Sequence, residues 1–134
     1  MDTYHVVVLG SGSVGETVAT TVARGGKSVA LVEQELLGGE CPYFACMPSK
    51  AMLRSAAARH DAGRLTELGG AASQPSLDEP AAAYTHAVRR RDEVAEHRDD
   101  TGAADNATQA GVTLVRGRGR VVRPGVVDVD GREL

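Results

Sequence analysis

The stretch Tyr4-His-Val-Val-Val-Leu-Gly-Ser-Gly-Ser-Val-Gly15 decides how this chain folds. Its first half, residues 4–9, is a nearly continuous apolar run, which is typical of a parallel strand buried on both faces. Its second half follows the pattern G-x-G-x-x-G. Residues 16–24 are then predicted to form a short helix that ends at a glycine pair, and residues 28–32 form a second apolar strand. The opening therefore predicts a β-α-β unit of an α/β fold.

The glycine loop has the spacing of a dinucleotide-binding turn. Gly10 allows the tight turn, Gly12 lets a pyrophosphate approach the backbone, and Gly15 allows close packing of helix on strand. The N-terminus of the predicted helix then offers N–H groups and the positive end of the helix dipole to phosphate. The loop therefore predicts a phosphate-binding turn in its proper context, after a strand and before a helix.

Glu33 closes the second strand, about twenty residues after the loop, and Gln34 follows it. A carboxylate at this place can accept hydrogen bonds from both hydroxyls of an adenosine ribose, and it would repel a 2′-phosphate. The site therefore favours a dinucleotide other than NADP, and the loop alone does not separate FAD from NAD. The alternative interpretation is a glycine-rich turn beside a surface glutamate.

Two cysteines lie in the segment Gly38-Gly-Glu-Cys-Pro-Tyr-Phe-Ala-Cys-Met-Pro-Ser-Lys50. Five residues of regular α-helix rise about 7.5 Å, which exceeds the roughly 7 Å between Cα atoms that a disulfide can span. A bridge between Cys41 and Cys46 therefore requires a distorted turn. Pro42 and Pro48 are placed to provide that irregularity.

The position of Cys46 suits redox chemistry. Helix is predicted from residue 47 onward, so Cys46 falls at or near a helix N-terminus, a place that favours a thiolate. A thiolate beside a partner cysteine is what reversible dithiol–disulfide exchange requires. The alternatives are two inert cysteines or half of a zinc site. Zinc needs about four ligands, the chain has no third cysteine, and its four histidines are scattered.

The remaining segments continue an α/β pattern. Helix is predicted as far as His60, a loop over residues 61–77, and a longer helix from near Asp78 that ends at Gly102. Three short β-branched runs follow, separated by Gly and Pro, and they predict a strand that feeds a small antiparallel meander. These runs are residues 112–115, 120–123 and 126–129.

Composition narrows the class of protein. A chain of 134 residues with 42% hydrophobic and 25% charged residues fits one globular domain. The net charge of −3 gives no reason to expect nucleic acid as a partner. The basic cluster at residues 89–91 is followed directly by acidic residues and is expected to be a solvated helix face. No apolar stretch reaches the length of a membrane span and no signal pattern opens the chain, so the expected compartment is the cytoplasm without a membrane partner.

The pattern Gly-Gly-x-Cys-x₄-Cys-x-Pro-Ser-Lys, placed soon after the glycine loop and Glu33, resembles the class I pyridine nucleotide–disulfide oxidoreductases. These include dihydrolipoyl dehydrogenase, glutathione reductase and mercuric reductase, and the resemblance runs along nearly the whole chain. It implies an incomplete Rossmann-like FAD-binding domain, with a parallel sheet, helices and a C-terminal antiparallel meander. Residues 1–134 would be the N-terminal portion of the FAD/NAD(P)-binding domain. The cofactors implied are FAD and, for the full-length architecture, NAD(P)H.

The resemblance also assigns roles to residues. Cys46 would be the flavin-proximal thiol and Cys41 the interchange thiol that attacks a disulfide substrate. Lys50 would lie near the flavin ring, where a cation tunes its electronics, and Gly119 would lie where the backbone meets adenine. The implied cofactor-binding positions are Gly10, Gly12, Ser13, Val14, Gly15, Glu33, Gln34, Gly39, Glu40, Cys41, Lys50 and Gly119.

Some features depart from the better known members of this family. Glu40 replaces the common threonine, and the residues between the cysteines also differ, so the partner could be a lipoyl group, another small disulfide or a different electron acceptor. The sequence holds no second G-x-G-x-x-G, and the NAD(P)H-binding and dimerisation domains of the homodimeric full-length relatives are not among these residues. We therefore expect that the chain alone does not turn over NAD(P)H. The alternatives are a non-catalytic FAD-binding module and the start of an NAD-dependent dehydrogenase, which leaves the cysteine pair unexplained.

Overall fold

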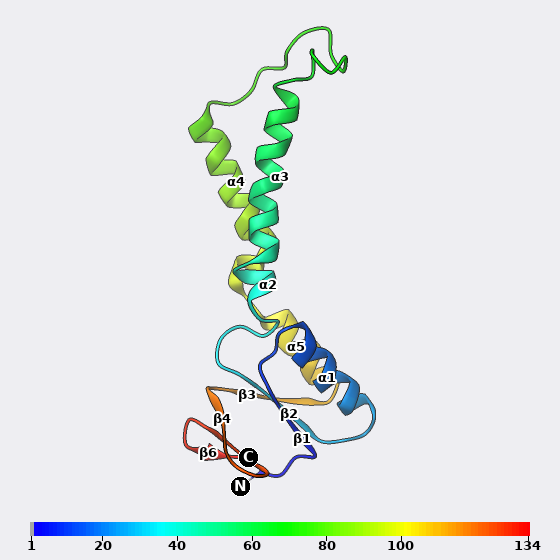
Figure 1. Cartoon of the computed structure of the whole chain (residues 1–134), viewed down its shortest axis with the longest axis vertical. Coiled ribbons are helices and arrows are strands. Elements are labelled where there is room, and N and C mark those ends of the chain that lie inside the picture. Colours follow the sequence, from blue (N-terminus) through cyan, green and yellow to red (C-terminus); the bar gives the residue numbers. More distant parts are fainter. Residues whose placement is uncertain (1) are drawn as a thin grey trace. The chain divides into compact units, whose positions relative to one another are not determined.

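The computed structural model describes residues 2–134, which fall into two compact units. The first, the sheet unit, consists of residues 2–41 together with Asp99–Leu134. The second, the hairpin unit, consists of Pro42–Arg98. Figure 1 labels most of the helices and strands of both units.

A three-stranded parallel sheet is the centre of the sheet unit. Its strands are β1 (Val6–Leu9), β2 (Val29–Glu33) and β3 (Val112–Arg116), in the order β1-β2-β3. All five residues of β2 are buried, as is typical of the central strand of a parallel sheet. The sequence predicted burial on both faces for β1, but β1 is only partly buried, and Leu9 is exposed. The reason is that β1 lies at the edge of the sheet within the described residues, with one neighbouring strand.

Two helices cover one face of this sheet. They are α1 (Ser13–Arg24), which connects β1 to β2, and α5 (Thr101–Gln109), which precedes β3. The fully buried Ala19 of α1 and Ala107 of α5 pack in one cluster with the apolar side chains of β2 and β3. Alanine at both contact points lets the helices approach the sheet closely, because it carries only one side-chain carbon. The predicted β-α-β opening is therefore confirmed.

An antiparallel meander covers the other face. It consists of β4 (Gly119–Arg123), β5 (Val126–Val129) and β6 (Arg132–Glu133). Asp130 and Gly131 connect β5 to β6 with φ values of 49° and 91°, as a two-residue hairpin turn requires. Alternate residues of β2 pack against the meander in a second core cluster, which consists of Ala30, Val32, Val115, Val127, Val129 and Leu134. The predicted α/β class, with a parallel sheet, helices and a small antiparallel meander, is confirmed.

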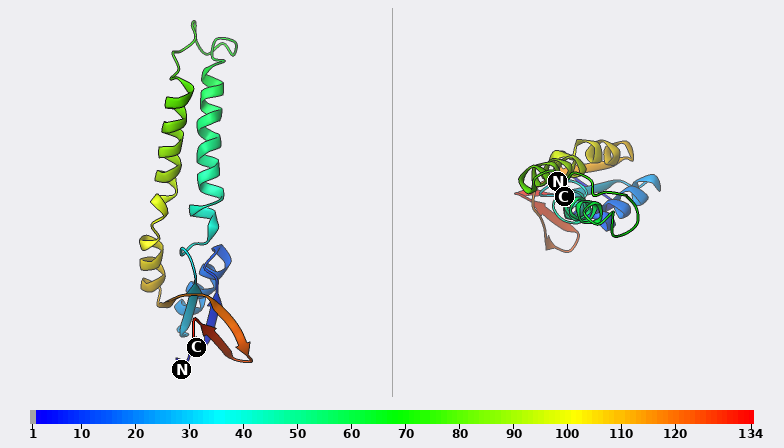
Figure 2. Two further views of the ribbon diagram at one scale, coloured as in Figure 1. Left: turned by 90° about the vertical axis from the view of Figure 1, so that its left-hand side faces the viewer. Right: turned by 90° about the horizontal axis from the view of Figure 1, so that it is seen from above.

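Two long helices form the body of the hairpin unit. They are α3 (Cys46–Ala62) and α4 (Pro80–Val94), and they lie side by side in both views of Figure 2. Ala51 of α3 and Ala87 of α4 are buried, so small residues again lie where the helices pack. Pro80 occupies the first turn of α4, where its missing N–H is tolerated. A single short turn, α2 (Glu40–Tyr43), crosses the boundary between the units.

The predicted long helix from Asp78 to Gly102 is wrong in its extent. The helix α4 ends at Val94, a single turn η1 (Glu96–Arg98) follows, and α5 then begins at Thr101. The three residues of η1 have φ values of 51°, 51° and 60°, a left-handed conformation that no α-helix continues through. Asp99 accepts hydrogen bonds from the N–H and hydroxyl groups of Thr101 and thereby starts the new helix. Gly102, the predicted breaker, lies inside α5.

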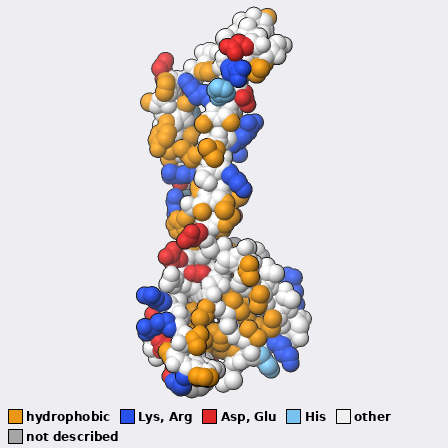
Figure 3. Space-filling model, in the orientation of Figure 1, with side chains coloured by type: hydrophobic (Ala, Val, Ile, Leu, Met, Phe, Trp, Pro, Cys, Tyr) orange, Lys and Arg blue, Asp and Glu red, His pale blue; other side chains and the backbone are white. Residues whose placement is uncertain are grey.

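The basic cluster on α4 is a solvated helix face, as predicted. Arg89 lies 3.7 Å from Glu93, and Arg91 lies 2.7 Å from Asp92. Figure 3 shows basic and apolar side chains interspersed along the hairpin helices, without a continuous patch of one sign. Among residues 2–134 there is also no helix with the length and apolar content that crossing a bilayer demands.

Candidate functional site

The glycine loop connects the end of β1 to the start of α1, and its three glycines have different roles in the backbone. Gly10 has a φ of 90°, which side chains other than glycine rarely allow. Gly12 precedes the first turn of α1, where no side chain of the described residues caps the helix. A Cβ atom placed on Gly12 would meet no atom within 4 Å, whereas one placed on Gly15 would collide with the carbonyl oxygen of Gly10. Gly12 therefore faces open space, and Gly15 is required for packing.

Ser11 joins this loop to Glu33. Its side chain is fully buried, and its hydroxyl and backbone N–H both donate to Oε2 of Glu33, at 2.6 and 2.9 Å. The N–H of Gly38 donates to the same hydroxyl at 3.1 Å. Ser11 was not predicted from the sequence, because a variable position of the glycine pattern carries no signal until the contact with β2 is known. Its short polar side chain between two glycines is the only hint that the sequence contains.

The Glu33 carboxylate is held in its ionised form. Burial raises the pKa of Glu33, but the hydrogen bonds donated by Ser11 and by the backbone N–H of Glu35 together outweigh burial and hold the pKa below its usual value. Glu33 is therefore a buried acceptor at neutral pH, with only 9% of its surface exposed. An ionised carboxylate at the carboxyl end of a parallel strand can bind the hydroxyls of a ribose.

The lowered pKa of Glu33 predicts a pH-dependent stability. The stabilisation is complete above the unfolded-state pKa of about 4.3 and is lost as the pH falls through the lower pKa of the folded state. The variant Ser11→Ala should lose about 1–3 kcal/mol of unfolding free energy at pH 7, because Glu33 loses a donor and the N–H of Gly38 loses its acceptor. Urea unfolding of wild type and variant at pH 7 and pH 3 should show this difference shrinking in acid. An equal difference at both pH values would contradict the role of the ionised carboxylate.

A cavity of about 330 Å³ lies beside Glu33 in the sheet unit, within the size range of small-molecule sites. It opens near the carboxyl ends of β1 and β2, the edge where α/β sheets bind ligands. A Cβ atom on Gly119 would lie 2.6 Å from a side-chain carbon of Leu9 and 3.0 Å from one of Val32, so only glycine allows these walls to close. The cavity is lined by Leu9, Gly10, Val32, Glu33, Gln34, Gly117, Arg118 and Gly119.

The cavity brings together four of the residues that the sequence predicted: Gly10, Glu33, Gln34 and Gly119. The helix positions Ser13 and Val14 lie in the first turn of α1, and Val14 is 75% exposed. Leu9, Val32, Gly117 and Arg118 complete the cavity and were not predicted. Their contribution depends on the approach of the meander to β1 and β2, which no local pattern reveals.

The start of the cysteine segment is anchored to the glycine loop. Gly39 has a φ of 75°, and a Cβ atom on it would lie 2.9 Å from the Cα of Gly12. Asp100 accepts a hydrogen bond from the N–H of Leu37 at 2.6 Å and also pairs with Arg116 at 2.7 Å. The sequence analysis missed Asp100, which lies 63 residues from its backbone partner. These contacts fix the chain just before Glu40 and Cys41.

The two cysteines occupy different elements. Cys41 lies in α2 and is exposed, in the sheet unit. Cys46 is the first residue of α3 and is half-buried, as the predicted helix start requires. Lys50 follows one turn later and is exposed. Because Cys46 and Lys50 belong to the hairpin unit, the pairing of the cysteines and the approach of Lys50 to a flavin stay predictions.

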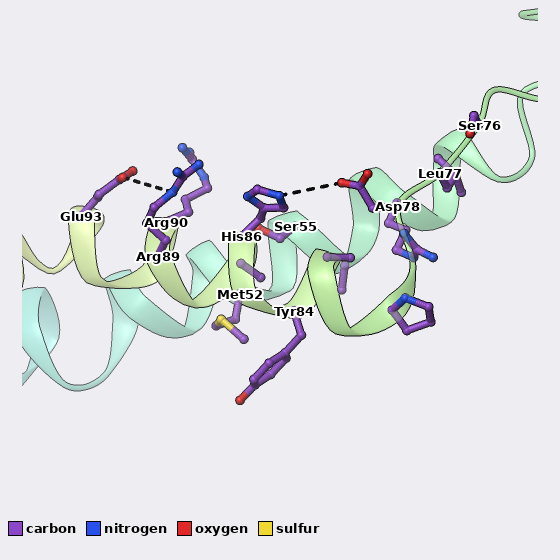
Figure 4. Close-up of a pocket in the computed structure, with 15 residues that line it drawn as sticks. Met52, Ser55, Ser76, Leu77, Asp78, Tyr84, His86, Arg89, Arg90 and Glu93 are labelled. Carbon is purple, nitrogen blue, oxygen red and sulfur yellow. Dashed lines mark ion pairs between the residues drawn. The ribbon is translucent and has the colours of Figure 1, made fainter.

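The hairpin unit has a cavity of its own, of about 860 Å³, between α3 and α4. Figure 4 shows two ion pairs at its border, with Arg89 3.7 Å from Glu93 and His86 3.9 Å from Asp78. Tyr84 also lines it but is 63% exposed. None of the predicted site residues contributes to this cavity, so it is separate from the candidate nucleotide site.

Comparison with known proteins identifies similar chains. The family described as "Pyridine nucleotide-disulphide oxidoreductase" matches residues 4–134. Dihydrolipoyl dehydrogenase of Vibrio cholerae is 34% identical over 130 residues, which cover 96% of this chain and 26% of that protein. Mercuric reductase of Streptomyces lividans is 39% identical over 79 residues, which cover 58% of this chain and 17% of that protein.

A solved structure gives the same match. The HOCl-induced flavoprotein disulfide reductase RclA from Escherichia coli superimposes with a TM-score of 0.68 at 25% identity, over 98% of this chain and 26% of that one. The chain thus spans about a quarter of the length of the Vibrio cholerae and Escherichia coli proteins.

Proposed function

The chain belongs to the pyridine nucleotide-disulphide oxidoreductase family, and on that premise we propose that it binds FAD and carries a redox-active disulfide between Cys41 and Cys46. Electrons would come from NAD(P)H in the whole protein and pass to a small disulfide or a related acceptor. The observation that carries the proposal is the buried, ionised Glu33 beside the glycine loop and the cavity. This combination suits the adenosine half of a dinucleotide.

The residues of the sheet unit fit FAD by their chemistry. Glu33 would accept hydrogen bonds from the ribose hydroxyls, and the open space at Gly12 would admit the pyrophosphate to the start of α1. Gly119 would let its strand lie directly against Leu9 and Val32, so that these residues form the walls of the adenine site. When bound, FAD would supply a centre that takes two electrons from a nicotinamide and gives them to a disulfide.

The cysteines would then reduce the substrate by thiol–disulfide exchange. The exposed Cys41, as a thiolate, attacks one sulfur of the substrate disulfide, and the second substrate sulfur leaves as a thiolate. Cys46 then attacks the Cys41 sulfur, which forms the Cys41–Cys46 disulfide and releases the first substrate sulfur. Both released thiolates take protons from water, so the two electrons of the dithiol reach the substrate. NAD(P)H supplies the two electrons that restore the dithiol.

Two variants, each with one cysteine replaced by serine, test this proposal. The purified chain is loaded with FAD, reduced mildly with a dithiol, and followed by its visible absorption spectrum. The wild type should develop a new long-wavelength absorbance on reduction, because Cys46 is the thiol assigned to the flavin. Cys41→Ser, which has no disulfide to reduce, should show this absorbance before the dithiol is added. Cys46→Ser should lack it completely while binding FAD equally well. An identical spectrum from Cys46→Ser and wild type would overturn the assignment.

A non-catalytic FAD-binding module is the second candidate. It is favoured because these 134 residues contain a single G-x-G-x-x-G fingerprint, which would bind one dinucleotide and leave the NAD(P)H without a site of its own. We further propose that these residues alone do not oxidise NAD(P)H steadily. A yellow chain whose spectrum does not respond to Cys46 would support this second candidate, and steady NAD(P)H oxidation by the chain with added FAD would contradict the proposed inactivity.

A further inference from the structure

We propose that Arg118 is a specificity residue that covers one face of the adenine ring in the candidate nucleotide site. The proposal rests on the proposed function and assigns to this site a contact that neither the glycine loop nor the cysteine motif contains. It starts from the cavity beside Glu33, which Arg118 lines together with Gly117 and Gly119.

Arg118 differs from the other arginines at and around the meander, because each of those has a carboxylate partner. The pairs are Arg116 with Asp100, Arg120 with Asp128, Arg123 with Glu133, and Arg132 with Asp2. Within residues 2–134, the guanidinium of Arg118 has neither an ion pair nor a hydrogen bond. A cation that lines a cavity without an internal partner is available to a ligand.

The backbone at Arg118 is held in place although its side chain has no partner. The Arg118 N–H donates to Oδ2 of Asp130 at 3.1 Å. The preceding Gly117 has a φ of 142°, and its N–H donates to the carbonyl oxygen of Glu33 at 2.9 Å. These two hydrogen bonds tie the residue to the meander turn on one side and to β2 on the other. The side chain therefore leaves the backbone at a fixed point of the cavity wall.

The chemistry of the cavity favours adenine over phosphate as the ligand of Arg118. Phosphates are bound best at the start of α1, where Gly12 leaves open space and no side chain of the described residues caps the helix. The ionised Glu33 shares the cavity with Arg118 and would repel a phosphate there. A planar guanidinium stacks well on an aromatic face and needs no anion. With the ribose hydroxyls held by Glu33, the adjoining base is the part of the dinucleotide that suits the guanidinium of Arg118.

The test measures ADP binding to the purified 134-residue chain by calorimetry, at two salt concentrations. Arg118→Ala should weaken ADP binding roughly two- to thirty-fold, the range of a cation on an aromatic ring. Arg120→Ala is the matched control, because Arg120 is exposed on the neighbouring strand and already pairs with Asp128. It should bind ADP like the wild type.

Two further variants separate stacking from charge. The chain has no tryptophan, so Arg118→Trp introduces a single indole whose fluorescence reports on the site. Stacking on adenine predicts that Arg118→Trp restores ADP affinity and that ADP quenches the indole, whereas Arg118→Lys remains weakened. The opposite pattern, with lysine restoring affinity and tryptophan not, would assign Arg118 to a phosphate and overturn the proposal.

The remaining outcomes separate this inference from the proposed function. Binding of ADP by wild type and Arg118→Ala with equal affinity would overturn the role of Arg118 and leave the nucleotide site standing. A wild-type chain that is folded by circular dichroism but does not bind ADP would overturn the nucleotide site, and the role of Arg118 with it.

Discussion

Gly12→Ala is expected to weaken FAD binding about 100-fold while it changes the free energy of unfolding by less than about 1 kcal/mol. The new methyl group meets no protein atom within 4 Å, and the backbone of Gly12, with a φ of −58°, is one that alanine adopts. The methyl group would instead occupy the space through which, in the proposed function, a pyrophosphate approaches the start of α1. One or two charged hydrogen bonds would be lost, each contributing about 1.5–3 kcal/mol.

The measurement pairs a flavin fluorescence titration with urea unfolding of the same preparation. Gly102→Ala is the control, because Gly102 lies in the first turn of α5 and a Cβ atom there is also unobstructed. This control should bind FAD like the wild type. If Gly12→Ala binds FAD as tightly as wild type does, the pyrophosphate does not approach the backbone at Gly12.

Gly15→Ala is expected to lower the free energy of unfolding by about 3 kcal/mol, the upper part of the range for overpacking a core. Glycine inside a helix is ordinarily less stable than alanine by about 1 kcal/mol, so helix propensity alone predicts the opposite sign. At Gly15 the added Cβ would overlap the carbonyl oxygen of Gly10 and lie 3.0 Å from its carbonyl carbon. Backbone atoms cannot rotate away, so α1 would have to move off β1.

Urea unfolding followed by circular dichroism at 222 nm checks this prediction, and Gly102→Ala again serves as the control. Gly102 lies in the helix α5 with no atom in contact range, so its replacement should leave the protein as stable as wild type or slightly more stable. A Gly15→Ala variant as stable as wild type would show that the helix and strand are not packed at this point.

The local patterns of the sequence predicted much of the sheet unit. The run before Gly10, the glycine spacing and the second apolar run predicted β1, α1 and β2, because strand and helix periodicity and glycine conformation are local properties. Helix was predicted from residue 47 onward for the same reason, and α3 begins at Cys46. The break between α4 and α5 was placed at Gly102, where a glycine is visible, although it occurs at Glu96–Arg98. Three consecutive left-handed residues without glycine have no local sequence signal.

The sequence by itself determined the class of the fold, the glycine turn between β1 and α1 and the spacing of Cys41 and Cys46, because each depends on residues that are close in the chain. Only the tertiary structure showed that buried Ser11 positions Glu33 and that Arg118 shares its cavity. Ser11 and Glu33 are 22 residues apart, and the meander that carries Arg118 follows β2 by more than 80 residues. Such contacts depend on how β2 packs against its neighbours, which is a property of the folded core and not of any one segment.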